Sequence, residues 1–241
     1  HYRDQWAEAF GMTYEDANGI KKNCHQTTYG MSERLLGAVV GTHGDDNGLI
    51  FPPKIAPIQV VIMPVAAHKN EEVMKTVNLV SETLRNHGFR THIDARKIRP
   101  GQKFYDWEIK GVPLRLEIGP RDIENGTAFA ARRTGGKSPI SIADIVSEVS
   151  NELVEIAAEL SDRCNKTYSN MVQELNSLDD QIDDSIVYEI AFDGTDSDAE
   201  ILEKHTGLTI LGDDISQYDE PRKCIITGNM TTRKQHIGKM Y

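Results

Sequence analysis

The protein has 241 residues and a mass of 27.0 kDa, enough for one large domain or two to three small ones. Apolar residues make up 39% and charged residues 27%, a composition that excludes a disordered or a fibrous chain. The formal net charge of −10, taken alone, argues against a nucleic-acid-binding protein, because such proteins usually carry a basic surface. No run of about 18 apolar residues occurs, so no membrane span is expected. The three cysteines are far apart, which favours the cytosol over a disulfide framework.

The charge is distributed unevenly along the chain. Residues 68–140 hold 14 Lys or Arg and 9 Asp or Glu, a net charge of +5. Residues 141–241 hold 8 Lys or Arg and 21 Asp or Glu, a net charge of −13. A basic middle before an acidic region favours a polyanion-binding module joined to an acidic one, although random variation of the surface explains the +5 equally well.

The first 57 residues predict small elements and a linker. Phe10 onward predicts a hairpin that turns at Asn18-Gly19, and residues 26–30 predict a strand that ends at a glycine. Ser32 is expected to cap a helix over residues 33–40. Its apolar stripe, expected to be packed, is Leu35, Leu36, Val39 and Val40. The proline-rich residues 51–57 predict a stiff linker.

Residues 58–164 have the pattern of a small α/β domain. The predicted strands are residues 58–63, 89–93, 113–118 and 127–132. The predicted helices follow Asn70 up to Gly88, span residues 104–110, and begin near Ser141. This β-α-β-α-β-β-α order predicts a mixed, mainly parallel sheet. The acidic remainder is weakly patterned, with strands expected at 187–191 and 208–211 and a short helix at 200–205.

Two stretches carry candidate chemistry. Residues 26–34 place a strand, a glycine and then an arginine on the first turn of a helix, an arrangement that can present a cation to a nucleotide. Residues 107–122 alternate Arg, Glu and Lys along a strand and its flanking loops. Carboxylates accept hydrogen bonds from base amino groups, and arginine reads guanine edges. The alternatives are a surface arginine beside a structural glycine and a salt-bridged edge strand. The sequence shows no arrangement of a nucleophile and a base.

The motifs in these stretches closely resemble those of prolyl-tRNA synthetases of the archaeal and eukaryotic-like type. The resemblance covers residues 1–140 closely and the rest more weakly, and its motifs are long and in the family's order. They are His25-Gln26-Thr27-Thr28-Tyr29-Gly30-Met31-Ser32-Glu33-Arg34, Arg99-Pro100-Gly101-Gln102-Lys103-Phe104, Trp107-Glu108-Ile109-Lys110-Gly111-Val112-Pro113 and Glu117-Ile118-Gly119-Pro120-Arg121-Asp122.

The resemblance implies roles for particular residues. Gly30 to Arg34 correspond to motif 3 of class II synthetases, with Arg34 as the catalytic, ATP-binding arginine. The residues implied at the ATP and proline pocket are His1, Gln26, Thr28, Gly30 and Arg34. The residues implied to read the anticodon are Glu108, Arg115 and Lys137, and Tyr241 corresponds to a terminus that folds back toward the catalytic domain.

Two departures from the family qualify these roles. Motifs 1 and 2 are absent and the sequence does not begin with Met, so we expect a piece of a longer chain that alone does not activate proline. The family's four zinc-binding cysteines correspond here to Asp193, Asp198, Cys224 and Thr227. Because a structural zinc site prefers thiolate and imidazole ligands, we expect no structural zinc and no other metal site.

The resemblance implies three parts. Residues 1–56 would be the end of an antiparallel class II catalytic domain, residues 57–150 an α/β anticodon-binding domain, and residues 151–241 a small α+β domain resembling the family's zinc-binding-like domain. The function implied is that of a proline–tRNA ligase, a cytoplasmic enzyme using ATP, Mg²⁺, proline and tRNA(Pro), homodimeric when full-length. The alternative is a non-catalytic tRNA-binding module.

Overall fold

A computed structural model describes residues 2–67 and 70–240 of the chain. The N-terminal segment holds a short helix α1 (Gln5–Phe10) and an antiparallel hairpin of β1 (Thr13–Glu15) and β2 (Lys21–Asn23). The hairpin turns at Asn18-Gly19, with Gly19 at a φ of 76°, so this prediction is confirmed. The predicted strand over residues 26–30 is wrong. Only Gln26 forms a bridge, to Arg3, because no further strand lies alongside to complete a ladder.

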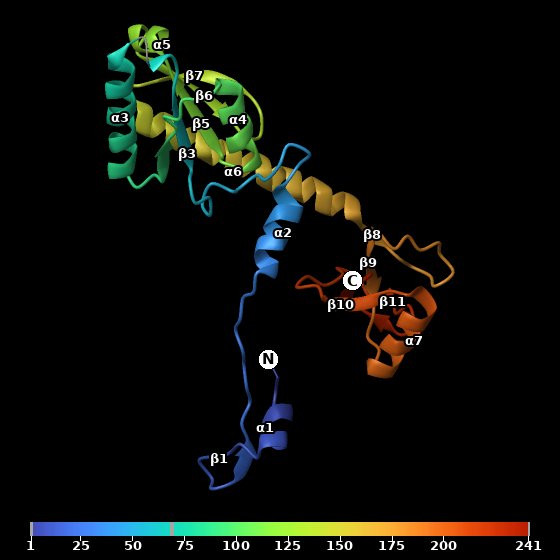
Figure 1. Ribbon diagram of the computed structural model, residues 1–241. Helices are drawn as coiled ribbons and strands as arrows, with labels where there is room; N and C mark the ends of the chain where they lie inside the picture. Colours follow the sequence, from blue (N-terminus) through green and yellow to red (C-terminus); the bar gives the residue numbers. More distant parts are fainter. Residues whose placement is uncertain (1, 68–69, 241) are drawn as a thin grey trace.

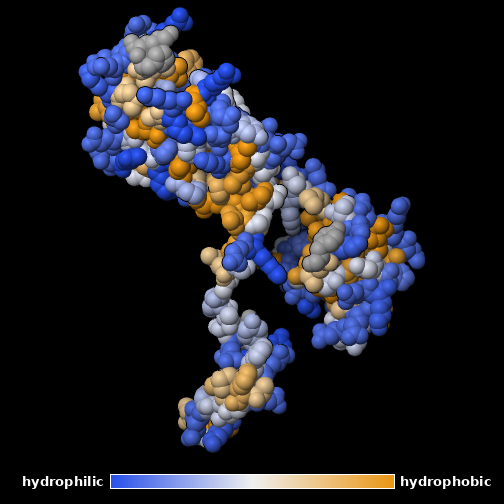
Figure 2. Space-filling model, viewed as in Figure 1, coloured by the Kyte–Doolittle hydropathy of each residue, from blue (hydrophilic) through white to orange (hydrophobic). Residues whose placement is uncertain are grey.

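Helix α2 (Arg34–His43) stands apart from the large body of the molecule (Figure 1). None of its residues is buried, and the side chains of Leu35 and Leu36 are 50% and 56% exposed. The packed stripe expected on this helix is therefore wrong for the described residues. Apolar side chains also gather on the surface where this helix joins the large body (Figure 2). At that end the Arg163 guanidinium of helix α6 donates to the His43 carbonyl.

The large body is a five-stranded sheet in the order β4-β3-β5-β6-β7. Its strands are β3 (Val60–Pro64), β4 (Thr91–Ile93), β5 (Leu114–Ile118), β6 (Thr127–Arg132) and β7 (Lys137–Ser141). β3 is parallel to both β4 and β5, whereas the pairs β5–β6 and β6–β7 are antiparallel. The sheet is mixed, as predicted, but its parallel and antiparallel pairs are equal in number. β7 accounts for the difference, since Gly135 and Gly136, both at positive φ, allow the chain to turn back on β6.

Helices cover both faces of this sheet. Helices α3 (Glu71–Asn86) and α6 (Ile145–Met171) cover one face, where the main core contains Val60, Ile62, Leu114 and Leu116. Helix α4 (Pro100–Ile109) covers the other face, where Val61, Met63, Trp107 and Val112 form a smaller cluster. The short α5 (Pro120–Glu124) connects β5 to β6. Asn70 caps α3 as predicted, its Oδ1 accepting from the Glu72 amide at 2.9 Å.

Helix α6 runs through residue 150, where the sequence placed the end of the second part. Its residues Leu153, Ile156 and Leu160 still pack into the main core. Arg132 of β6 forms ion pairs with three glutamates on this helix, namely Glu152, Glu155 and Glu159. The packing unit around the sheet therefore extends to about Leu160.

The C-terminal residues form a separate core around a second sheet in the order β10-β13-β9-β8. Its strands are β8 (Val172–Glu174), β9 (Val187–Ala191), β10 (Thr209–Asp213) and β13 (Lys234–Gly238). Helix α7 (Asp196–Thr206) buries Leu202 against it, and β11 (Arg222–Lys223) pairs with β12 (Met230–Thr231). The expected strand over 187–191 is confirmed. Within residues 2–67 and 70–240, no helix is long and apolar enough to cross a membrane.

Candidate nucleic-acid interface

A row of side chains crosses the sheet on the face that α4 covers. Val61 of β3 lies opposite Arg115 of β5, which lies opposite Ala131 of β6, which in turn lies opposite Lys137 of β7. Side chains in register point to the same face of a sheet, so Arg115 and Lys137 flank the small Ala131. The short side chain between two long cations leaves a hollow in the surface.

This hollow is a cavity of about 390 Å³, and Glu108 lies on its rim. The Glu108 carboxylate is 3.7 Å from Arg115 Nη1 and its side chain is 45% exposed. Trp107 and Val112 supply apolar lining, and the turn at Gly135-Gly136 closes one end. The three residues that the motifs implied for anticodon reading are thus brought together, from α4, β5 and β7.

Glu117, two residues after Arg115 on the same strand face, holds both cations in place. Its buried carboxylate accepts from Arg115 Nε at 3.1 Å and from Lys137 Nζ at 2.7 Å. Glu117 thus ties the two cations to each other, while the second carboxylate, Glu108, lies on the rim of the cavity. Glu117 is the first residue of one of the family motifs, but the resemblance implied no role for it. The signal that could have identified it was the Arg-x-Glu alternation, which places both side chains on one face.

Aromatic rings lie under the two cations. The Arg115 guanidinium is 4.1 Å from the centroid of the Phe104 ring, and Lys137 Nζ is 5.1 Å from that of Phe129. Such cation–π contacts hold each cation over the face of an aromatic ring, and bases stack on aromatic rings and on guanidinium groups. The pair to Glu108 is long and not hydrogen-bonded, so both groups keep hydrogen-bonding capacity toward a ligand.

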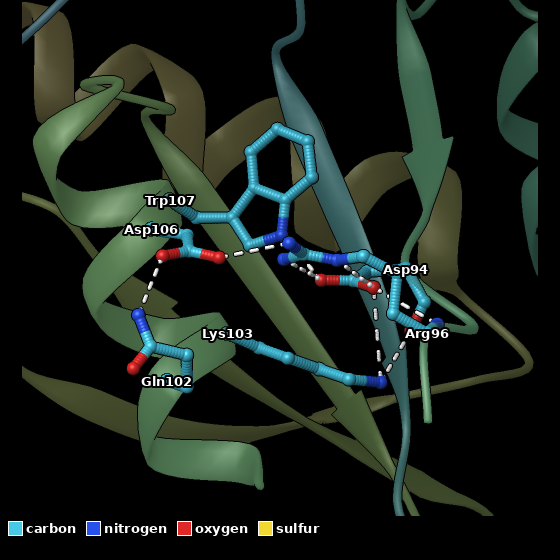
Figure 3. A network of polar contacts seen from close by, with 6 residues as sticks. All are labelled: Asp94, Arg96, Gln102, Lys103, Asp106 and Trp107. Atoms are coloured by element: carbon cyan, nitrogen blue, oxygen red, sulfur yellow. Dashed lines mark hydrogen bonds and ion pairs between the residues drawn. The ribbon is translucent and has the colours of Figure 1, made fainter. Parts of the chain in front are cut away.

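Helix α4 is fixed against the sheet by a buried carboxylate at the end of β4 (Figure 3). Asp94 accepts from Arg96 Nε and Nη2 and from Trp107 Nε1, at 3.0, 2.7 and 2.8 Å. Lys103 Nζ donates to the Asp94 carbonyl at 2.8 Å. Burial alone would raise the pKa of Asp94, but the hydrogen bonds from Arg96 and Trp107 outweigh it and hold the pKa well below its usual range. This network also fixes the position of Glu108, because Glu108 directly follows Trp107 in the helix.

The cavity suits an unpaired guanine. Arginine can donate two hydrogen bonds to the O6 and N7 of guanine, and a carboxylate accepts from its N1 and N2 hydrogens. Lys137, 45% exposed, adds charge for the sugar–phosphate backbone. The chemistry of this lining is therefore that of a binding site. It contains no nucleophile beside a base.

The residues implied at the ATP and proline pocket are not gathered into a site. Thr28 and Gly30 are exposed on the segment that leads into α2, Arg34 is exposed at the start of that helix, and Gln26 is half-buried beside Met12. No ion pair of the Arg34 side chain occurs within the described part of the chain. His1 and Tyr241 lie outside the described residues. The roles of these residues in catalysis stay predictions.

The four positions that correspond to the family's zinc ligands make hydrogen bonds of their own. Thr227 Oγ1 donates to Asp193 at 2.7 Å, and the Thr227 amide donates to Cys224 Sγ at 3.4 Å. Asp198 instead caps helix α7, accepting from the Thr195 amide and hydroxyl at 2.8 Å each. The hydrogen bonds from Thr227 and Cys224 lower the pKa of Asp193. The absence of structural zinc stays a prediction.

One other group of candidate metal ligands occurs among residues 2–67 and 70–240. It consists of Glu189, Asp214 and His236, whose ligand atoms lie within 4.8 Å of one another. The Lys234 ammonium is 3.2 Å from the Glu189 carboxylate, so a positive charge is already present at this cluster. The Glu189 carboxylate is therefore paired with a lysine in the absence of a metal ion.

Comparisons with known proteins agree with this geometry. Residues 59–152 match the family described as an anticodon binding domain. The proline–tRNA ligase of Thermococcus kodakarensis is 39% identical over 95% of this chain and 50% of its own length. That of Methanosarcina mazei is 38% identical over 100% of the chain and 51% of its own length.

Solved structures give the same result at the level of the fold. Prolyl-tRNA synthetase from Cryptosporidium parvum, crystallised with halofuginone and AMPPNP, matches 99% of this chain and 52% of its own with a TM-score of 0.89 at 29% identity. The Giardia lamblia prolyl-tRNA synthetase, in complex with prolyl-adenylate, matches with a TM-score of 0.86 at 26% identity.

The charged row therefore lies within the residues that match an anticodon binding domain. More particularly, the chain is similar along its whole length, in sequence and in fold, to prolyl-tRNA synthetases, which confirms the resemblance carried by its motifs. It spans about half the length of the relatives it matches.

Proposed function

We propose that this chain is the C-terminal half, from motif 3 onward, of a cytoplasmic proline–tRNA ligase. Residues 1–56 end the catalytic domain, the body around the sheet binds the anticodon of tRNA(Pro), and the C-terminal unit completes the chain. The structure supports one change to these boundaries, since the core of the anticodon-binding body includes Leu160. The full-length enzyme is proposed to act as a homodimer.

The observation that carries the proposal is the convergence of Glu108, Arg115 and Lys137 on one cavity. These residues are up to 29 positions apart in the sequence and come from one helix and two strands. A salt-bridged edge strand would account for the pairs with Glu117. It would not account for a hollow between the two cations with an exposed carboxylate on its rim.

The proposed reaction has two steps. The proline carboxylate attacks the α-phosphorus of ATP, pyrophosphate leaves, and prolyl-adenylate forms. A hydroxyl of the terminal ribose of tRNA(Pro) then attacks the prolyl carbonyl carbon, and AMP leaves. Mg²⁺ would offset the charge of the ATP phosphates. The exposed Arg34 guanidinium, on the first turn of α2, is the group of this chain that we assign to the same phosphates.

Anticodon reading is tested with the 241-residue chain and a fluorescent anticodon stem-loop of tRNA(Pro). Arg115→Ala should weaken binding by about 10- to 100-fold, the range for one lost bidentate contact, and should remove the preference for guanine over adenine in the anticodon. Arg121→Ala is the matched control, because Arg121 is an exposed arginine of α5 outside the cavity. An Arg115→Ala variant that folds and keeps the guanine preference would contradict the proposal.

The catalytic assignment needs the full-length protein. Arg34→Ala should abolish proline-dependent exchange of pyrophosphate into ATP, whereas Arg115→Ala should leave this exchange nearly intact and slow aminoacylation of tRNA. Normal exchange by Arg34→Ala would show that Arg34 does not contact the phosphates. A parallel fall of both steps in Arg115→Ala would show that the cavity is not a tRNA-reading site.

A further inference from the structure

A second, larger cavity lies near the N-terminal end of helix α4. Its volume is about 740 Å³, and it opens between the residues that follow β3, the residues that follow β4 and the first turn of α4. β3 and β4 are parallel, so both present their carboxyl ends here. Ligands of open α/β sheets bind in the crevice outside the carboxyl ends of the strands. The family resemblance gave this cavity no role.

The lining of this cavity combines an apolar floor with a basic rim. Met63, Val65 and Phe104 supply carbon surface, and Arg96, Lys97 and Lys103 supply charge. The three cations of the rim differ in whether they are already paired with a carboxylate. Arg96 and Lys103 are bound by Asp94, and Arg96 is also paired with Asp106 at 2.8 Å. Lys97 is exposed and has no carboxylate partner among the described residues, so its ammonium is available to an anionic ligand.

Helix α4 joins this cavity to the one that holds Arg115. Lys103 and Phe104 line the second cavity, and Trp107 and Glu108, four positions later, line the first. Phe104 lines the second cavity and also contacts the first through Arg115, whose guanidinium lies 4.1 Å from the centroid of its ring. A flexible ligand that extends around one turn of α4 therefore reaches both cavities at once.

We propose that the second cavity binds the base of a further unpaired nucleotide of the same RNA loop. The base lies against Phe104 and the apolar floor, and an adjacent phosphate pairs with Lys97. An aromatic ring at the floor and a single available cation fit a nucleotide better than an apolar peptide, which would leave Lys97 without a partner. This inference rests on the proposed function, since it requires an RNA held at Arg115.

The test uses the 241-residue chain and anticodon stem-loops in which each loop position in turn lacks its base. For the unchanged protein, removal of one base other than guanine should weaken binding about tenfold, as expected for the loss of one stacked base. Ala95→Trp fills the cavity, so it should weaken binding of the intact loop equally and make that abasic position neutral. Ala158→Trp, at an exposed alanine of α6, is the matched control.

The role of Lys97 has a separate readout. Lys97→Ala should reduce the slope of log K against log salt by about 0.7, the value for one phosphate contact on a single strand. Lys75→Ala is its control, because Lys75 is an exposed lysine of α3 that already pairs with Glu72. A slope unchanged by Lys97→Ala would contradict the phosphate contact.

The outcomes separate this inference from the proposed function. If the guanine preference is present but Ala95→Trp leaves the abasic profile unchanged, the second cavity is not a base site and the proposed function stands. If free AMP or GMP binds the cavity and Ala95→Trp abolishes that binding without affecting the stem-loop, the ligand is a mononucleotide and the inference is wrong. If the unchanged protein shows no guanine preference at all, the proposed function fails and this inference fails with it.

Discussion

Asp94 is a single carboxylate that fixes the positions of residues lining both cavities. Its side chain is fully buried, and its partners line the two cavities, Arg96 and Lys103 the larger one and Trp107 the smaller one. Asp94→Asn keeps the size of the side chain and removes its charge. Arg96 and the buried Lys103 then lose the anion that compensates them.

The expected loss follows from these contacts. Breaking a buried ion pair on one side costs about 3 to 5 kcal/mol. Because asparagine still accepts one hydrogen bond and Arg96 keeps Asp106, we expect the lower value, about 3 kcal/mol. With a slope of about 2 kcal/mol per molar urea, this loss lowers the midpoint of unfolding by about 1.5 M.

The pH dependence gives an independent check with a definite sign. Because the pKa of Asp94 is depressed in the folded protein, its contribution to stability is present above the unfolded pKa of about 3.9 and is lost as the pH falls through the folded pKa. The difference between the original protein and Asp94→Asn should therefore be full at pH 7. It should shrink below about pH 4.

Trp107 reports on this body directly. The chain has two tryptophans, and Trp6→Phe removes the one that is half-exposed in the N-terminal segment. Urea unfolding in that background is followed by the fluorescence of Trp107, which is 6% exposed. Asp106→Asn is the matched control and should cost less than about 1 kcal/mol, because Asp106 is a partly exposed partner of the same Arg96. Equal losses in both variants, or a difference that is independent of pH between 2 and 7, would refute the reasoning.

Three further predictions concern other parts of the fold. Gly111→Ala should lower the free energy of unfolding in urea by about 3 kcal/mol, since Gly111 has a φ of 68° and a Cβ would lie 2.5 Å from the Leu49 carbonyl oxygen. Its control is Gly101→Ala, which has open space around it and should change the free energy of unfolding by less than about 1 kcal/mol. Arg133→Ala should cost about 2 kcal/mol at pH 7 and less below pH 3, because the hydrogen bonds from Arg133 hold the pKa of Asp45 at about 2. EDTA should leave thermal unfolding of the C-terminal unit unchanged, and a fall in its midpoint would reveal a bound metal.

Sequence periodicity located the elements of the central body well. The apolar run of β3, the Asn70 cap and the inward positions of α6 are local features, and burial follows them closely. The errors occur where local pattern depends on a distant partner. Residues 26–30 have strand-like composition without a neighbouring strand to pair with. Leu35 and Leu36 have helical spacing without a surface to pack against.

The candidate site divides in the same way. The motifs named Glu108, Arg115 and Lys137 but could not show that Ala131 separates the two cations or that Glu117 holds both. That arrangement depends on the hairpin of β6 and β7, of which the sequence predicted only β6. The second cavity could not be predicted from the sequence for a related reason. It lies at the carboxyl ends of β3 and β4, which become neighbours only when the sheet forms in the order β4-β3-β5.

The sequence by itself determined the family resemblance, the regional change of charge and the types of most elements, because these depend on residue identity and spacing over short distances. Only the tertiary structure decided which charges are free. Asp94 and Glu117 neutralise some cations of the basic middle region, while Lys97 is left open to solvent beside a cavity. A count of charges cannot make that distinction, because the strength of an electrostatic contact depends on distance and burial. Strand order and register determine both.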